Sequence, residues 1–150
     1  MVATYENISK QQSRSSRNKK ESDPTGTALV KQYCKDIDEW PDNWAISDSD
    51  IRIGKAILEQ FKLLLADRIQ KGRAKTTINR YAGYLAALGG ELISRINYDD
   101  CLRKLSARKL ILEYVDENGG PLWRHAYDEL DHSRYDSVCR ALYKVIVKLE

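Results

Sequence analysis

Apolar residues recur at three- and four-residue steps along two long stretches of the chain, which is the period of a helix that buries one face. The first stretch, residues 53–69, follows the cap-rich sequence SDSD and ends close to Gly72. It predicts a helix that is capped by Ser47 or Ser49, runs to about Lys71 and stops at the glycine.

The second stretch, residues 78–96, keeps the helical period throughout and predicts a helix that begins near Thr76 or Thr77. Glycines at positions 83, 89 and 90 lie inside it. Each glycine costs up to about 1 kcal/mol in a helix interior relative to alanine. They are tolerated if a neighbouring helix approaches closely there; otherwise the helix bends or breaks near residues 89–90.

The C-terminal third predicts three further helices: one over residues 106–120 capped by Ser106, a short one over 121–130 with Pro121 in its first turn, and a last one from Ser133. No segment alternates apolar and polar residues with the period of a strand. The expected fold class is therefore all-α, a bundle of four to five main helices.

The first 27 residues are rich in Ser, Gln, Asn and Lys and hold few large apolar groups, so they predict a disordered basic arm. We expect residues 28–150 to form a single helical domain. In this domain a short helix and a tryptophan-containing segment (28–49) precede the core bundle (50–150).

An acidic segment, residues 36–50, contains both Trp40 and Trp44. Pro41 predicts that the short helix before it is broken here. The two tryptophans, together with Ile46, either anchor the segment across the bundle as a strap or form a hot spot for a protein partner.

The charge is distributed unevenly along the chain, although the net charge is only +3. Residues 28–50 carry 2 bases and 6 acids, whereas residues 51–150 carry 18 bases and 13 acids. The net value therefore understates the local fields.

Candidate chemistry for catalysis or cofactor binding is sparse. The sequence has two histidines and three widely spaced cysteines without CxxC spacing, and it contains no HExxH, P-loop or GxGxxG motif. We expect reduced thiols, at least two of them in the core, in a cytoplasmic protein without a secretory signal or a membrane span. We expect no enzyme activity, no metal and no cofactor.

One basic stretch has no simple structural explanation. KGRAKTTINRY (71–81) lies in a window without acids between Asp67 and Glu91, and its cations are Lys71, Arg73, Lys75 and Arg80. A helix C-terminus explains the first of these, but cations at the start of the next helix oppose its dipole. A bound anion reverses that cost, so the stretch predicts a phosphate-binding surface.

Residues 56–88 resemble the first two helices of the core-binding (SAM-like, N-terminal) domain of tyrosine recombinases and phage integrases. The family pattern is an apolar helix, a glycine-containing turn and a helix of the form T-x-x-x-Y-x-x-x-L, matched here by Gly72, Thr77, Tyr81 and Leu85. Residues 132–149 resemble the closing helix of the family through Ser133, Arg140 and Leu142, although Asp136 stands where the family often has threonine.

The resemblance implies a four-helix domain that clamps duplex DNA from one side. The cluster of positive charge places Lys71 and Arg73 in the expected contact surface. The resemblance adds Lys75, Thr76, Thr77, Asn79 and Arg80, with Ser133 and Arg134 at the start of the last helix.

The sequence therefore leads to two functional hypotheses. The first is a noncatalytic DNA-binding protein, either a mobile-element accessory factor or an integrase relic. We expect no strand cleavage by this chain alone, because it contains no His-x-x-Arg, which the family's catalytic domain carries beyond this module. The second is a protein-interaction module that uses the acidic segment 36–50 with Trp40 and Trp44.

Overall fold

A computed structural model describes residues 26–148, and the expected disordered arm (1–27) lies almost entirely outside the described residues. The described chain is helical, with no named strand and one isolated bridge between Asp116 and Gly119. The all-α prediction is therefore confirmed. The helices are η2 (Thr27–Leu29), α2 (Val30–Tyr33), η3 (Ile37–Glu39), α3 (Trp40–Trp44), α4 (Ser49–Gln70), α5 (Lys75–Tyr98), η4 (Asp100–Lys104), α6 (Ala107–Tyr114) and α7 (Glu129–Lys148).

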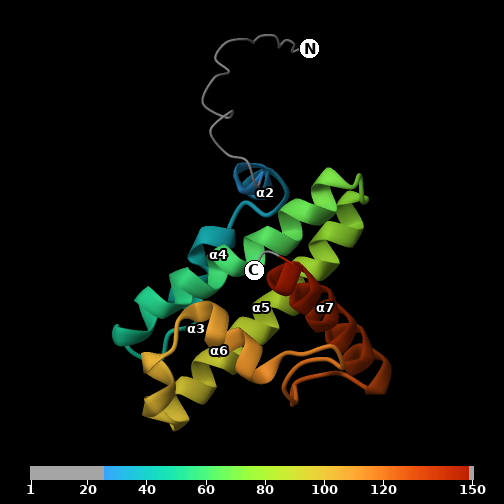
Figure 1. Ribbon diagram of the computed structural model, residues 1–150. Helices are drawn as coiled ribbons and strands as arrows, with labels where there is room; N and C mark the ends of the chain where they lie inside the picture. Colours follow the sequence, from blue (N-terminus) through green and yellow to red (C-terminus); the bar gives the residue numbers. More distant parts are fainter. Residues whose placement is uncertain (1–25, 149–150) are drawn as a thin grey trace, which may run out of the picture.

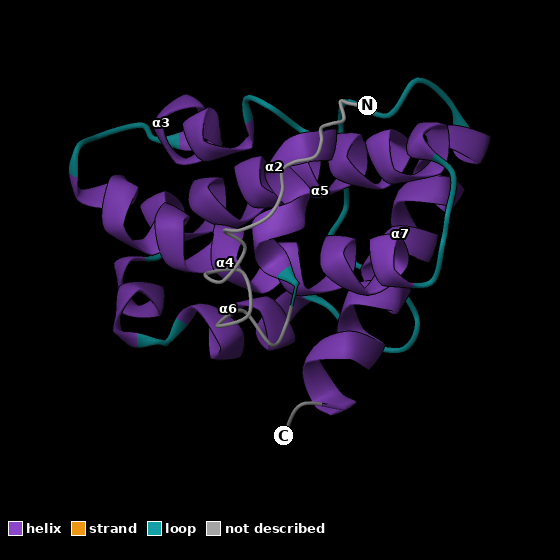
Figure 2. Ribbon diagram, turned by 90° about the horizontal axis from the view of Figure 1, so that it is seen from above, coloured by secondary structure: helices purple, strands orange, loops and turns teal. Residues whose placement is uncertain are grey.

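Two long helices, α4 and α5, form an antiparallel hairpin on which the other helices pack (Figure 1). Seen from above, α3 and α6 cover opposite sides of this pair, and α7 lies beside it (Figure 2). Helix α4 contacts α3, α5, α6 and α7. The core lies where these helices meet, and its largest fully buried side chains include Phe61 of α4, Leu85 of α5 and Tyr135 of α7.

The apolar residues that repeat with the helical period in α4 and α5 form the buried faces of these helices, as predicted. Ile57, Phe61 and Leu64 are fully buried, as are Leu85 and Leu92 on the facing helix. Two cysteines, at positions 34 and 139, are buried and free, as expected for core thiols. Within residues 26–148, no helix is both long enough and apolar enough to cross a bilayer.

The turn between α4 and α5 is fixed by a glycine, as predicted. Gly72 has φ 79°, a conformation that side chains rarely adopt. Its N–H donates to the Ile69 carbonyl (3.0 Å), and the Arg73 N–H donates to the Arg68 carbonyl (3.1 Å). This is a Schellman motif, which satisfies the last carbonyls of α4 and reverses the chain.

The start of α4 is stabilised differently from the serine cap that the sequence predicts. Asp48 occupies the N-cap without a side-chain hydrogen bond, and the two serines bond to each other. Instead, the fully buried carboxylate of Asp50 accepts from the N–H groups of Ile46 (2.8 Å) and Ser47 (3.1 Å). Asp50, the second residue of α4, thus binds backbone N–H groups of the segment that precedes the helix.

The same carboxylate joins α4 to the far end of α5. Asp50 also accepts from Asn97 Nδ2 (3.0 Å) and Arg103 Nη2 (2.8 Å). Burial alone would raise the pKa of Asp50, but the hydrogen bonds from Asn97, the Ile46 N–H, Arg103 and the Ser47 N–H outweigh it and lower the pKa to about 2. Asp50 is therefore ionised at neutral pH and fully partnered.

The acidic segment packs on the bundle, which confirms the strap interpretation of its tryptophans. Pro41 lies in the first turn of the short helix α3, which begins at Trp40, instead of breaking a helix. Trp40 is 9% exposed, and Trp44 Nε1 donates to the Ala86 carbonyl of α5 (2.8 Å). Ile46, expected to be a third anchor, is 66% exposed instead.

A close approach to Trp44 accounts for one helix glycine, and α5 neither breaks nor ends at residues 89–90. A Cβ on Gly89 would lie 2.1–2.5 Å from three atoms of the Trp44 ring. Gly83 faces open space, with no atom within 4 Å of its would-be Cβ. The two glycines therefore have different roles in the same helix.

Three predictions for the C-terminal third need correction. Ser106 does cap α6, accepting from the Lys109 N–H (3.2 Å), but α6 ends at Tyr114, well before residue 120. Residues 121–128 form no helix. The last helix begins at Glu129, four residues before the expected start at Ser133.

Side chains of α7 hold the α6–α7 connection in its non-helical path. Asp136 Oδ1 accepts from the Gly120 N–H (3.0 Å), and His132 Nε2 accepts from the Trp123 N–H (3.1 Å). These hydrogen bonds satisfy the two N–H groups and hold the connection in a path that differs from the predicted helix over 121–130.

Candidate nucleic-acid interface

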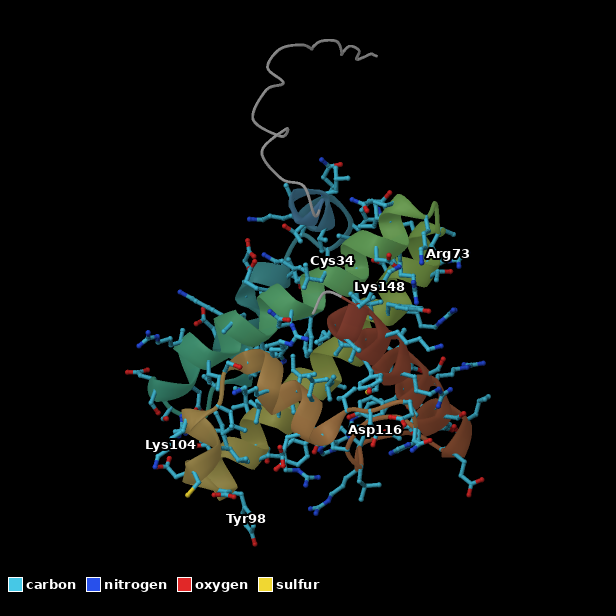
Figure 3. All side chains as sticks on the ribbon, viewed as in Figure 1. Cys34, Arg73, Tyr98, Lys104, Asp116 and Lys148 are labelled. Carbon is cyan, nitrogen blue, oxygen red and sulfur yellow. The ribbon has the colours of Figure 1, made fainter. Side chains whose placement is uncertain are left out.

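The basic stretch forms the exposed tip of the α4–α5 hairpin and the first turns of α5. Lys71, Arg73, Lys75 and Arg80 are all exposed, and no described carboxylate pairs with the last three. Figure 3 shows Arg73 and Lys148 toward the same end of the molecule, with Tyr98 and Lys104 at the opposite end. The fold therefore gathers cations from separate helices at one end.

The first turn of α5 carries no side-chain cap. The N-cap residue, Ala74, is extended (φ −64°, ψ 153°) and has no acceptor to offer, and the first turn contains no acid. The first N–H groups of a helix lack intrahelical partners, so here they are left for water or for an anion. The cations Lys75 and Arg80 flank these free donors.

Neither threonine that was expected to start this helix acts as its cap. Helix α5 begins at Lys75, and Thr76 and Thr77 already lie within its first turn. Thr76 and Asn79 are exposed and belong to the outer face with Arg80, whereas Thr77 is half-buried.

A surface hollow of about 300 Å³ joins the two groups of DNA-contacting residues that the family resemblance implies. Helix α5 supplies Arg80 and α7 supplies Arg134, two cations that are 54 positions apart in the sequence. The remaining lining residues are Tyr81, Tyr84, Ser137 and Val138. Two arginines and three hydroxyl-bearing side chains around a small hollow fit a phosphate group.

Asp131, an acid bonded to the lining residue Tyr84, is already engaged. Its carboxylate accepts from the Tyr127 N–H (2.9 Å) and from the Tyr84 hydroxyl (2.7 Å). These two hydrogen bonds lower the pKa of Asp131, so it stays ionised beside Arg134. Asp131 offsets part of the positive charge of Arg134, whereas no described carboxylate pairs with the exposed Arg80.

Ser133 does not begin a helix, contrary to the expectation. It is the fifth residue of α7 and is exposed, while the Asp128 side chain accepts from the Asp131 N–H (2.8 Å) at the helix start. Arg134 keeps a place in the interface through the hollow, but Ser133 offers no free helix N-terminus to a phosphate.

A second, neighbouring hollow of about 210 Å³ contains two lysines that the sequence analysis missed, Lys144 and Lys148. It lies between the end of α4 and the C-terminal half of α7, and its charged lining is Asp67, Arg68, Lys71, Lys144 and Lys148. The signal was present as a stripe on α7 in which Arg134, Ser137, Ala141, Lys144 and Lys148 follow one another at three- and four-residue steps.

Within residues 26–148, no group of three or more His, Cys, Asp or Glu side chains could hold a metal ion. Burial raises the pKa of the Cys139 thiol to about 12, which leaves it a protonated core thiol.

Comparisons of the chain with protein-family models, with curated proteins and with solved structures found no match.

Proposed function

We propose that this protein is a noncatalytic DNA-binding protein that contacts the phosphate backbone through the end of α4, the start of α5 and one face of α7. The observation that carries the proposal is the shared hollow of Arg80 and Arg134. Cations from two helices that are distant in sequence converge where no carboxylate lines the hollow, which is the arrangement that a polyanion requires.

The uncapped start of α5 adds directional donors to this charge. Backbone N–H groups at a helix N-terminus bind phosphate oxygens, and the helix dipole favours the negative charge. Lys75 and Arg80 then oppose the dipole only while the site is empty. A bound phosphate turns both unfavourable terms into favourable ones.

A polymer is a better ligand for this face than a single small anion. The exposed cations extend from Arg73 at the hairpin tip to Arg80 and across to Arg134. Backbone contacts of this kind give affinity with little sequence readout. The resemblance to recombinase core-binding domains supports duplex DNA as the polymer, and a mobile-element accessory factor or an integrase relic as the biological role.

The alternative function, a protein-interaction module, depends on the acidic segment 36–50. Its two tryptophans are occupied in packing against α5 and against each other, with ring centroids 5.9 Å apart. What the segment offers to a partner is therefore its exposed acids, not an aromatic hot spot.

Duplex DNA binding should depend strongly on salt. If about four phosphates are engaged, the slope of log K against log salt should be near −3.6. Replacing Lys75 and Arg80 together by Glu should weaken binding at least about tenfold and reduce the slope to about −1.8, because two contacts are lost. Fluorescence anisotropy with a labelled duplex at several salt concentrations measures both quantities.

The matched control reverses two exposed lysines outside the proposed interface, Lys104 at the other end of the molecule (Figure 3) and Lys109 on α6. This variant has the same net charge as the first one and should bind almost as the unmodified protein does. Equal loss in both variants would mean that only overall charge matters, and a double variant at Lys75 and Arg80 that binds normally would remove α5 from the interface.

A further inference from the structure

The hollow between α4 and α7 contains four cations around a single carboxylate. One oxygen of Asp67, Oδ2, pairs both with Arg68 Nη1 and with Lys71 Nζ (3.3 Å). Lys144 and Lys148 line the same hollow from α7, and no described carboxylate pairs with either of them. The charged groups of the hollow therefore sum to +3 when Asp67 is ionised.

The two lysines of α7 repel each other in the absence of a ligand, although the helix dipole favours Lys148 in the last turn. They are separated by four residues, so they lie on the same helix face, where like charges repel each other. The facing end of α4 adds Arg68 and Lys71, which increases this repulsion. An anion between the two helices would relieve it.

Arg68 is held in place before any ligand arrives. Its guanidinium lies over the Tyr81 ring, 5.6 Å from the ring centroid, and its side chain is only 16% exposed. Tyr81 in turn lines the first hollow. The Arg68–Tyr81 pair thus stands where the two hollows meet.

We propose that this second hollow binds a phosphate of the same nucleic acid, and that Asp67 occupies the phosphate position in the free protein. The inference rests on the proposed function for the nature of the anion. Asp67 holds Arg68 and Lys71 in position, and it must give up these cations when a phosphate enters. It therefore limits affinity while it keeps the site assembled.

The positions of the two hollows on α7 suit a polymer backbone better than a single small anion. Arg134 and Lys144 are ten residues apart, which is about 15 Å along a helix at 1.5 Å per residue. A single phosphodiester cannot contact both residues at once. A nucleic-acid backbone running along α7 can fill both hollows.

Two variants test the second site by duplex binding and its salt dependence. Lys144→Gln combined with Lys148→Gln should weaken binding at least about threefold and reduce the magnitude of the salt slope by about 0.9, because one phosphate contact is lost. Asp67→Asn should have the opposite effect and tighten binding about three- to tenfold, because the internal competitor loses its charge. Circular dichroism should show that both variants remain folded.

The controls are Lys104→Gln with Lys109→Gln, and Asp42→Asn, which make the same charge changes at exposed positions away from the hollow. If the unmodified protein binds duplex DNA but the lysine variant keeps its affinity and slope, the second site is wrong. If Asp67→Asn binds equally or more weakly, or Asp42→Asn tightens binding equally, the competitor role is wrong. If the unmodified protein shows no duplex binding at low salt, the proposed function itself fails.

Discussion

Replacing Asp50 by Asn should destabilise the protein by about 3 kcal/mol, because truncating a buried ion pair leaves the remaining charge without compensation. The Asp50 side chain is 0% exposed and accepts four hydrogen bonds, from Asn97, Arg103 and two backbone N–H groups. Asparagine keeps the shape but turns an NH₂ group toward donors. The expected value lies at the low end for buried pairs because Arg103 is 25% exposed and also pairs with Asp100.

Urea unfolding monitored by circular dichroism measures this loss, and Asp48→Asn is the control. Asp48 is an exposed neighbour whose side chain makes no capping bond, so its replacement should change stability by less than about 0.5 kcal/mol. Similar losses in both variants would show that the negative charge near the helix start matters and the buried network does not.

The same carboxylate predicts an acid dependence of stability. The pKa of Asp50 is about 2 in the folded protein, below its usual value of 3.8. The unfolded chain therefore binds this proton more readily, and the stabilisation is complete above about pH 4 and is lost as the pH falls toward 2. It amounts to about 2 kcal/mol, and Asp50→Asn should remove this part of the acid dependence.

The second large effect is expected from adding one methyl group at Gly89. Gly89→Ala should cost about 2–3 kcal/mol, because the new Cβ would overlap the Trp44 ring and overpacking outweighs the gain in helix propensity. The ring cannot move away freely. It is bonded to the Ala86 carbonyl, and its centroid lies 5.8 Å from that of Phe61.

Gly83→Ala is the matched control, with the same chemical change in the same helix. Its Cβ would meet nothing within 4 Å, so it should stabilise the protein by up to about 1 kcal/mol. Thermal unfolding should therefore shift in opposite directions in the two variants. A smaller side chain at Trp44 should reduce the cost of Gly89→Ala, and the double-mutant cycle measures that coupling. Two variants that shift in the same direction would argue against the close approach.

The sequence predicted α4 and α5 well because their local signals agree with their tertiary contacts. Ile57, Phe61 and Leu85 repeat with the helical period and are all fully buried, and Gly72 is the turn residue that a Schellman motif requires. At these positions the isolated pattern and the folded environment favour the same conformation.

The α6–α7 connection was misread because its local pattern competes with contacts from a distant helix. Pro121, Trp123 and Ala126 suit a short helix, yet the chain there is bound by His132 and Asp136 of α7. Those partners lie 9 and 16 residues away from the donors that they bind. Periodicity within ten residues carries no information about them.

The candidate site was predicted in part for a related reason. The cluster at residues 71–80 is contiguous in sequence, so counting charges along the chain found it. Lys144 and Lys148 join the same face only because α7 packs beside the end of α4. Asp50 belongs to the cap-rich sequence SDSD, but its partners Asn97 and Arg103 lie far away in the sequence, and no local pattern connects them to it.

The central position of α4 has a consequence for amide hydrogen exchange. Because α3, α5, α6 and α7 all pack on it, the amides around Ile57–Leu65 can open only when the whole bundle opens. The hairpin tip at Gly72 and the first turn of α5 are exposed and can fray without disturbing that centre. Exchange should therefore be slowest in the middle of α4 and fastest at the basic tip. A ligand bound at the tip would then slow exchange there long before it affected the core.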